Sequence, residues 1–232
     1  MVCTTEIQAL RDRRYKSQIL YPGKRRGLNM QNTVIVAGFA DPVRDAQQTF
    51  RKVLKAMGEP GVIVSAYSPE ALLHLYPSTF AVCQTLLDQQ TTLWLSKEFS
   101  NPEIQHNLHF HTGMPLARHS MDAQFALAYA GEIATLDCFK KGTAEYPERN
   151  CTLILQVHTI SESPSTDQNS TTLKLSGPGI ETEHQIVIAG LSQAIIHYLT
   201  ERPDPFPLGI DFIFTAEQSL VAIPRTTQLE VC

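Results

Sequence analysis

An arginine followed by two threonines is the segment of this sequence best suited to bind an anion. Arg225, Thr226 and Thr227 directly follow a predicted strand near the end of the chain. A guanidinium binds phosphate or carboxylate through paired N–H groups, and threonine hydroxyls add further donors. Two interpretations stay open. Arg225 binds an anionic ligand, or it pairs with an acidic side chain such as Asp211 or Glu230 and holds the fold together.

A glycine turn and a second arginine are further candidates for anion binding. Gly177 and Gly179 stand in Ser-Gly-Pro-Gly-Ile after a predicted strand, where backbone N–H groups could cradle a phosphate. The segment lacks the Lys-Ser/Thr pair of a P-loop and the spacing of a dinucleotide-binding fingerprint, so a tight turn is the simpler interpretation. Arg51, on the predicted first helix, could contact an anion or simply lie exposed.

Two other groups of polar side chains are weaker candidates for a functional site. His109 and His111 would point to one face of a strand and could bind a metal, but no carboxylate or cysteine follows at ligand spacing. Glu145 and Glu148 could act as general acid and base, yet nothing places them beside a nucleophile. No motif of a serine hydrolase, a P-loop or a zinc protease occurs. The residues therefore identify neither a catalytic group nor a metal site.

Composition limits the class of protein. The 232 residues are 43% hydrophobic, which fits one large domain or two small ones. No apolar run approaches the ~20 residues of a membrane span, and the chain does not begin with the pattern of a signal peptide. The five cysteines are scattered and form no Cys-x-x-Cys, as is typical of reduced thiols. We expect a cytoplasmic protein without membrane contact.

Residues 1–29 differ in charge from the remainder. They hold seven of the 19 basic and two of the 23 acidic residues. The remainder is therefore acidic, which argues against wide contact with nucleic acid. We expect residues 1–29 to be a disordered leader or the product of a start codon assigned too early, although a basic nucleic-acid arm is an alternative. The domain then spans residues 30–232.

Helices and strands alternate along this domain. Asp41-Pro42 and Asn101-Pro102 each combine an N-cap residue with proline at the first helical position. The helix after Pro42 has apolar residues at three- and four-residue spacing that predict one buried face. They are Val43, Ala46, Phe50, Val53, Leu54 and Met57. Residues 152–160 form a continuous apolar run, which predicts a central strand covered on both faces.

The remaining elements complete the pattern. Strands are predicted at residues 61–66, 92–95, 125–129, 172–175, 210–215 and 219–223, and helices at 78–87, 102–108, 133–139 and 186–201. No Pro/Gly/Ser linker divides them. This order predicts a single α/β domain in three layers, a mixed sheet with helices on both faces.

From about residue 43 to residue 232 the sequence resembles the PhnH family of the bacterial carbon–phosphorus lyase pathway. The matching segments occur in a fixed order across the domain and include Ile223-Pro-Arg-Thr-Thr227. The others lie at 43–47, 50–57, 59–64, 94–96, 110–112, 142–144, 152–157, 177–180, 199–203 and 206–211.

This resemblance implies an α/β fold like the large domain of pyridoxal-phosphate transferases, without that cofactor and with no other. It implies a homodimer that joins PhnG, PhnI, PhnJ and, transiently, the nucleotide-binding PhnL. With PhnG, PhnI and PhnL, the family is required to transfer ribose 5-triphosphate from ATP to an alkylphosphonate. Adenine is displaced, and the product is α-D-ribose 1-methylphosphonate 5-triphosphate. PhnJ later cleaves its C–P bond.

Three functions remain open. The chain is an assembly subunit of this transferase complex, or it binds an anionic phosphonate or nucleotide itself and contributes to catalysis, or it is a pyridoxal-phosphate enzyme. The third function needs a lysine at a strand end that faces a phosphate site. The lysines after residue 29 have no such setting; they are Lys52, Lys55, Lys97, Lys140, Lys141 and Lys174.

Overall fold

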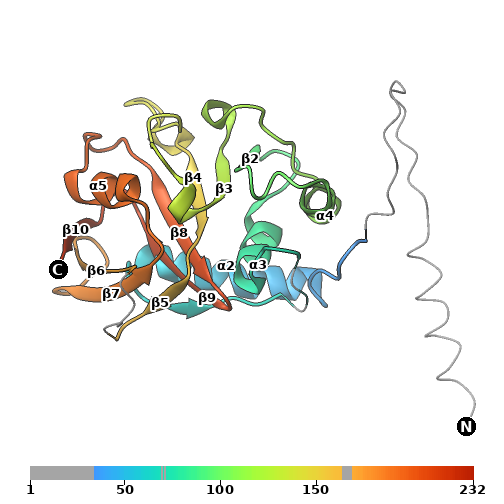
Figure 1. Ribbon diagram of the computed structural model, residues 1–232, viewed down its shortest axis with the longest axis horizontal. Coiled ribbons are helices and arrows are strands. Elements are labelled where there is room, and N and C mark those ends of the chain that lie inside the picture. Colours follow the sequence, from blue (N-terminus) through green and yellow to red (C-terminus); the bar gives the residue numbers. More distant parts are fainter. Residues whose placement is uncertain (1–33, 69, 71, 164–168) are drawn as a thin grey trace, which may run out of the picture. The chain divides into compact units, whose positions relative to one another are not determined.

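The computed structural model describes residues 34–68, 70, 72–163 and 169–232, so the predicted leader lies outside the described residues (Figure 1). In chain order its helices and strands are α2 (Pro42–Gly58), β1 (Val64–Ser65), α3 (Pro77–Leu86), β2 (Leu93–Leu95), α4 (Pro102–Thr112), β3 (Phe125–Tyr129), β4 (Thr152–Gln156), β5 (Thr159–Ser161), β6 (Ser170–Ser176), β7 (His184–Ala189), α5 (Gln193–Glu201), β8 (Asp211–Ala216), β9 (Ser219–Ile223) and β10 (Gln228–Val231). Short 3-10 turns lie at Ser120–Asp122, Ala130–Glu132 and Pro147–Arg149.

The larger of two sheets is mixed and has six strands in the order β1-β9-β8-β4-β3-β2. Strands β2, β3, β4 and β8 run parallel, and β9 returns antiparallel to β8. Strand β4 lies inside the sheet, with Ile154 opposite Leu127 on one side and Ile213 on the other. The predicted mixed α/β sheet is therefore confirmed, and so is its central strand over Thr152–Gln156. The strand predicted at residues 152–160 does not continue beyond Gln156, because Thr159–Ser161 forms β5 of the second sheet.

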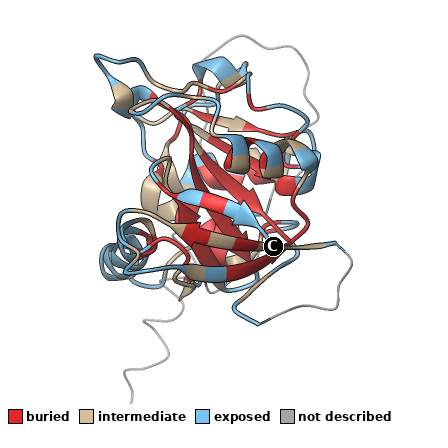
Figure 2. Ribbon diagram, turned by 90° about the vertical axis from the view of Figure 1, so that its left-hand side faces the viewer, coloured by how far each residue is buried: buried red, intermediate tan, exposed pale blue. Residues whose placement is uncertain are grey.

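Side chains alternate between the two faces of this sheet, and each face has its own core. On β4, Leu153 and Leu155 belong to one cluster of buried residues, and Ile154 belongs to the other. Phe212 and Ile213 of β8 are divided in the same way. Figure 2, which colours the ribbon by burial, shows most of the strands in the middle of the domain as buried.

One face is covered by helices and the other mainly by a second sheet. Residues of α2, α3 and α4 pack on the Ile154 face, among them Val53, Phe80 and Leu108. The opposite face packs against α5 and an antiparallel sheet in the order β10-β6-β7-β5. The predicted three layers with helices on both faces thus hold in part, because a four-stranded sheet shares the second outer layer with α5.

The segment predicted as one long helix, residues 186–201, is a strand followed by a helix. Ile186, Val187 and Ile188 are β-branched, which favours strand β7. Gly190 then takes φ +94°, a left-handed conformation that ends the strand, and Ser192 caps α5 by accepting a hydrogen bond from Ile195 N–H at 3.2 Å. The helix predicted at residues 133–139 is also wrong, because those residues form loops and turns.

Helix α2 begins as predicted, and its buried face matches the predicted one only in part: Val53 is buried and Met57 packs against the core. Asp41 caps it by accepting a hydrogen bond from Arg44 N–H at 3.1 Å. Its buried residues are Thr49, Val53 and Ala56, whereas three residues of the predicted inner face are exposed; they are Val43, Phe50 and Leu54. Apolar residues occur on two sides of this helix, so the spacing alone did not decide which side packs on the sheet.

The described cysteines carry free thiols. Cys83 and Cys151 are buried, and burial raises the pKa of each thiol to about 12. Both thiols are therefore neutral at physiological pH and behave as small apolar core residues.

Candidate functional site

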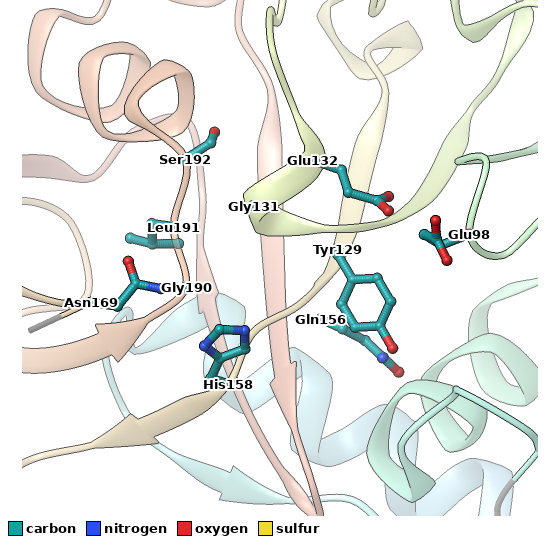
Figure 3. Close-up of a pocket in the computed structure, with 10 residues that line it drawn as sticks. All are labelled: Glu98, Tyr129, Gly131, Glu132, Gln156, His158, Asn169, Gly190, Leu191 and Ser192. Carbon is teal, nitrogen blue, oxygen red and sulfur yellow. The ribbon is translucent and has the colours of Figure 1, made fainter. Parts of the chain in front are cut away.

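The parallel strands bring polar side chains together where they end. Tyr129 ends β3 and Gln156 ends β4, and in an open α/β sheet the carboxyl edge is the usual place for a ligand. A cavity of about 560 Å³ opens here. It is lined by Glu98, Tyr129, Gly131, Glu132, Gln156, His158, Asn169, Gly190, Leu191 and Ser192 (Figure 3). We call it the carboxyl-edge pocket.

Two flanks of this pocket differ in chemistry. Glu98 and Glu132 extend from one flank, beside Tyr129 (Figure 3). His158 and the N-terminal end of α5 at Ser192 form the other flank. Gly190 lies close to the His158 ring, which is possible because glycine has no Cβ; an added Cβ would lie 3.2 Å from the ring. The pocket thus combines carboxylates, an imidazole and a phenol in one space.

The polar groups at the bottom of the pocket hold a neighbouring backbone segment. The Gln156 amide donates to His74 O at 2.9 Å and accepts from Tyr76 N–H and the Thr79 hydroxyl, both at 2.7 Å. Tyr129 also donates to His74 O, at 3.2 Å. Burial and neighbouring acidic groups raise the pKa of Tyr129, so its hydroxyl remains a hydrogen-bond donor at neutral pH.

Arg225, the main candidate from the sequence, is bound to protein groups. Its Nη2 lies 3.3 Å from Asp211 Oδ2, and its Nη1 donates to the carbonyls of Pro147 and, at 3.4 Å, Pro207. Its backbone N–H donates to Asp211 Oδ1 at 2.8 Å. The pairing with Asp211 is thus the arrangement in the structure, and binding of a ligand by Arg225 stays a prediction.

The other predicted anion-binding residues are divided between two places. Gly177 lies against the backbone of Thr226 and Thr227, where an added Cβ would be 3.3 Å from Thr226 O. Gly179 instead packs against the C-terminal end of α2, and Arg51 lies exposed about two turns earlier on that helix. The structure therefore groups Arg225, Thr226, Thr227 and Gly177 and leaves Gly179 and Arg51 outside the group.

The glycine segment is a tight turn. Ile180 N–H donates to Gly177 O at 3.1 Å, which closes a four-residue turn, and both glycines have positive φ. These conformations explain the two glycines without a ligand.

The histidine pair expected on a strand lies on helix α4 instead, so that expectation is wrong. His109 bonds to Met114 O and His111 to Val36 O, each at 3.0 Å. Glu145 and Glu148 are exposed. Within the ranges that the structure describes, no three His, Cys, Asp or Glu side chains are arranged to hold a metal ion.

The role of Arg202 was not predicted from the sequence. This residue ends α5 with φ 48°, and its Nη1 donates to Arg225 O at 3.0 Å. Its Nε and Nη2 are buried and have no hydrogen-bond partner among the residues that the structure describes. Only the Arg202-Pro203 pair was informative in the sequence, and it predicted no more than the end of a helix.

Comparison with known proteins identifies the family. The model of the bacterial phosphonate metabolism protein (PhnH) family matches residues 37–230. The chain is also 32% identical to the alpha-D-ribose 1-methylphosphonate 5-triphosphate synthase subunit PhnH of Rhizobium meliloti (strain 1021), over 88% of this chain and 99% of that subunit. The chain belongs to the PhnH family. The resemblance described from the sequence is therefore confirmed, and the matched range covers both arginines and the carboxyl-edge pocket.

A second relative is more distant. HtxG of Stutzerimonas stutzeri, whose name refers to a C-P lyase subunit, is 26% identical over 80% of this chain and 86% of its own length. Both relatives are thus named as subunits of larger assemblies in phosphonate chemistry. Separately, no helix in the described part of this PhnH-family chain has the length and apolar character needed to cross a membrane.

Proposed function

We propose that this chain is the PhnH subunit of a cytoplasmic α-D-ribose 1-methylphosphonate 5-triphosphate synthase. The supporting observation is the 32% identity to a subunit of that name over 99% of its length. In this role the chain works with PhnG, PhnI and PhnL in the transfer of ribose 5-triphosphate from ATP to an alkylphosphonate, with release of adenine. It also joins PhnJ in the core complex, and its main contribution is assembly and support.

The test is reconstitution from the subunits of the chain's own organism. PhnG, PhnI and PhnL are mixed with ATP and methylphosphonate, with and without this chain, and adenine is measured by chromatography. We expect adenine release, and a new phosphonate ester in the ³¹P spectrum, only when the chain is present. Equal adenine release in its absence would contradict the proposal.

A second candidate function is that the subunit binds an anionic phosphonate or nucleotide ligand itself and contributes to catalysis. The carboxyl-edge pocket supports the catalytic part of this function alone, because the cavity brings the His158 imidazole and the Tyr129 hydroxyl to one space. Its described lining has the carboxylates of Glu98 and Glu132 and no lysine or arginine to bind an anion. Substitution of His158 by Gln distinguishes the two functions. Adenine release falls at least about tenfold if the imidazole takes part in proton transfer, and it is unchanged if the subunit only supports assembly.

The fold proposed for the chain is that of the large domain of pyridoxal-phosphate transferases, used without the cofactor. The described lining of the carboxyl-edge pocket includes acidic and neutral side chains, and Lys174 lines a different cavity. An absorption band near ~400 nm in the purified protein would reveal a lysine imine and overturn this part of the proposal.

Alone, the chain is proposed to form a homodimer through exposed apolar side chains. Phe206 is 78% exposed and Val231 48% exposed, although Leu229, expected in the same patch, is buried. Phe50 and Leu54 of α2 provide a second exposed apolar strip. A monomer mass by light scattering at micromolar concentration would contradict this proposal.

A further inference from the structure

A second cavity, of about 450 Å³, lies where the end of α5 meets β6 and β10. Arg202 and Lys174 line it, together with Gln228 of β10. Helix α5 ends at this point because Arg202 adopts a left-handed conformation, with φ 48°. We call this the Arg202 cavity. It is separate from the carboxyl-edge pocket, and the two have no described lining residue in common.

The guanidinium of Arg202 has one edge without protein partners. Its Nη1 donates to Arg225 O, whereas Nε and Nη2 have neither a hydrogen bond nor an ion pair with any residue that the structure describes. Nε and Nη2 carry the two parallel N–H groups that bind a carboxylate or phosphate in bidentate fashion. Buried donors of a charged group are costly when they are left unpaired. The edge is therefore complementary to an oxyanion. Because Nε and Nη2 are buried, the guanidinium has to turn toward the cavity for an anion there to reach them.

The charges around the cavity are arranged by depth. Glu183 and Glu230 also line the cavity and are largely exposed, with 58% and 77% of their side chains accessible. Both pair with Lys174, at 2.7 Å and 3.7 Å. These carboxylates therefore already share a cation near solvent. Asp211 lies close enough to influence Arg202, but its oxygens bind Arg225 and Asn150. Arg202 thus has no ion pair of its own among the described residues, and Asp211 compensates its charge only from a longer distance.

The neighbouring turn contains another unpaired donor. Thr227 is 1% exposed, and its Oγ1 has no hydrogen-bond partner among the described residues. It stands between Arg225, whose carbonyl binds Arg202, and Gln228, which lines the cavity. Burial lowers the pKa of Arg202, because the desolvation of its guanidinium outweighs the opposing effects of Tyr198 and Asp211. An anion bound at this position would offset that desolvation.

We infer that the Arg202 cavity binds the phosphate or phosphonate group of a small molecule, with Arg202 Nε and Nη2 as its bidentate donors. The choice of a phosphorus oxyanion over a carboxylate rests on the proposed function. The alternative occupant is a carboxylate side chain of another subunit, which would meet the same edge. In both cases Arg202 binds the anion, whereas Arg225 supports the turn from which Arg202 is positioned.

The test is titration of the isolated full chain with methylphosphonate, inorganic phosphate and acetate, by calorimetry at constant ionic strength. We expect saturable binding of the two phosphorus oxyanions and weaker binding of acetate. Arg202→Gln removes the edge and should weaken binding at least about tenfold. Arg202→Lys keeps the charge but loses the paired donors, so its affinity should lie between those of the wild type and Arg202→Gln. The matched control is Arg118→Gln, an exposed arginine whose removal should leave affinity unchanged.

Three results would overturn the inference: no saturable binding to the wild-type chain, tighter binding of acetate than of both phosphorus oxyanions, or equal affinity in the wild type and Arg202→Lys. If Arg202→Gln does not fold, the Arg202→Lys comparison decides. Failure of this binding test can be distinguished from failure of the proposed function. A chain that supports adenine release in the reconstituted system without binding phosphate would exclude this site and keep the subunit role.

Discussion

Arg202 and Arg225 are joined by one hydrogen bond and yet have opposite surroundings. Arg225 has a carboxylate partner, Asp211, and two backbone carbonyls. Arg202 has the carbonyl of Arg225 and, among the described residues, no partner for Nε or Nη2. A guanidinium that protein groups satisfy stabilises the fold, whereas an unsatisfied one remains able to bind something else. The difference separates a structural arginine from a candidate binding residue.

The largest expected effect comes from removing the satisfied arginine. Arg225→Ala leaves the Asp211 carboxylate, mostly buried, with only Asn150 and a backbone N–H as partners. We expect the free energy of unfolding to fall by about 3 kcal/mol, measured by urea denaturation. Arg118→Ala on the surface serves as control and should change it by less than about 0.5 kcal/mol. A loss below about 1 kcal/mol for Arg225→Ala would show that the pairing is not structural.

The same contrast applies to uncharged groups. Gln156 makes three described hydrogen bonds, and Gln156→Leu removes them all. His74 O keeps the Tyr129 hydroxyl and the Thr79 hydroxyl keeps Thr215, but the Tyr76 N–H loses the partner described for it. We expect a loss of about 2 kcal/mol in the free energy of unfolding.

Ser96 is the matched control for Gln156. It is 4% exposed, and its hydroxyl has no hydrogen-bond partner within the described residues. Ser96→Ala should therefore change stability by less than about 0.5 kcal/mol in either direction. Similar losses for both variants in urea denaturation would contradict the distinction between satisfied and unsatisfied polar groups.

Removal of the unsatisfied arginine should have a smaller effect on folding. Arg202→Met deletes one hydrogen bond to Arg225 O but keeps the apolar stem of the side chain. In buffer free of phosphate and sulfate we expect a loss of about 1 kcal/mol or less, by the same denaturation assay. A loss as large as that of Arg225→Ala would mean that Arg202 also belongs to the structural framework.

The sequence predicted residue types and local boundaries better than long-range partners. The Asp41-Pro42 and Asn101-Pro102 helix starts and the strand at 125–129 are confirmed, because caps and short apolar runs are local features. For Arg225, the sequence predicted a functional or paired arginine. Its pairing with Asp211 depends on the adjacency of β8 and β9, which local sequence does not determine.

The failures have a similar cause. On α2 the apolar spacing correctly predicted a helix. Phe50 and Leu54 are nevertheless exposed, because the helix packs on the sheet through Thr49, Val53 and Ala56. The sequence did not point to Arg202, because its Nε and Nη2 lack partners only when the nearby carboxylates are bound elsewhere. Asp211 is bound by Arg225, and the exposed acids pair with Lys174. Such competition between partners is visible only in three dimensions.

The smallest effect is expected outside this comparison, at the basic leader. Deletion of residues 1–29, with Met30 as the new first residue, removes seven basic residues that lie outside the segment matched by the family model. We expect the melting temperature and solubility of the shortened chain to equal those of the full chain. A marked loss of either would show that the leader packs on the domain.

The different roles of the two arginines can be observed directly by nuclear magnetic resonance of arginine Nε–H groups. Arg202→Lys and Arg225→Lys assign the two signals, and methylphosphonate is then added to the wild-type chain. We predict that the Arg202 Nε–H signal shifts progressively to saturation while the Arg225 signal stays in place. A shift of the Arg225 signal alone, or no shift of the Arg202 signal at saturating ligand, would contradict the account.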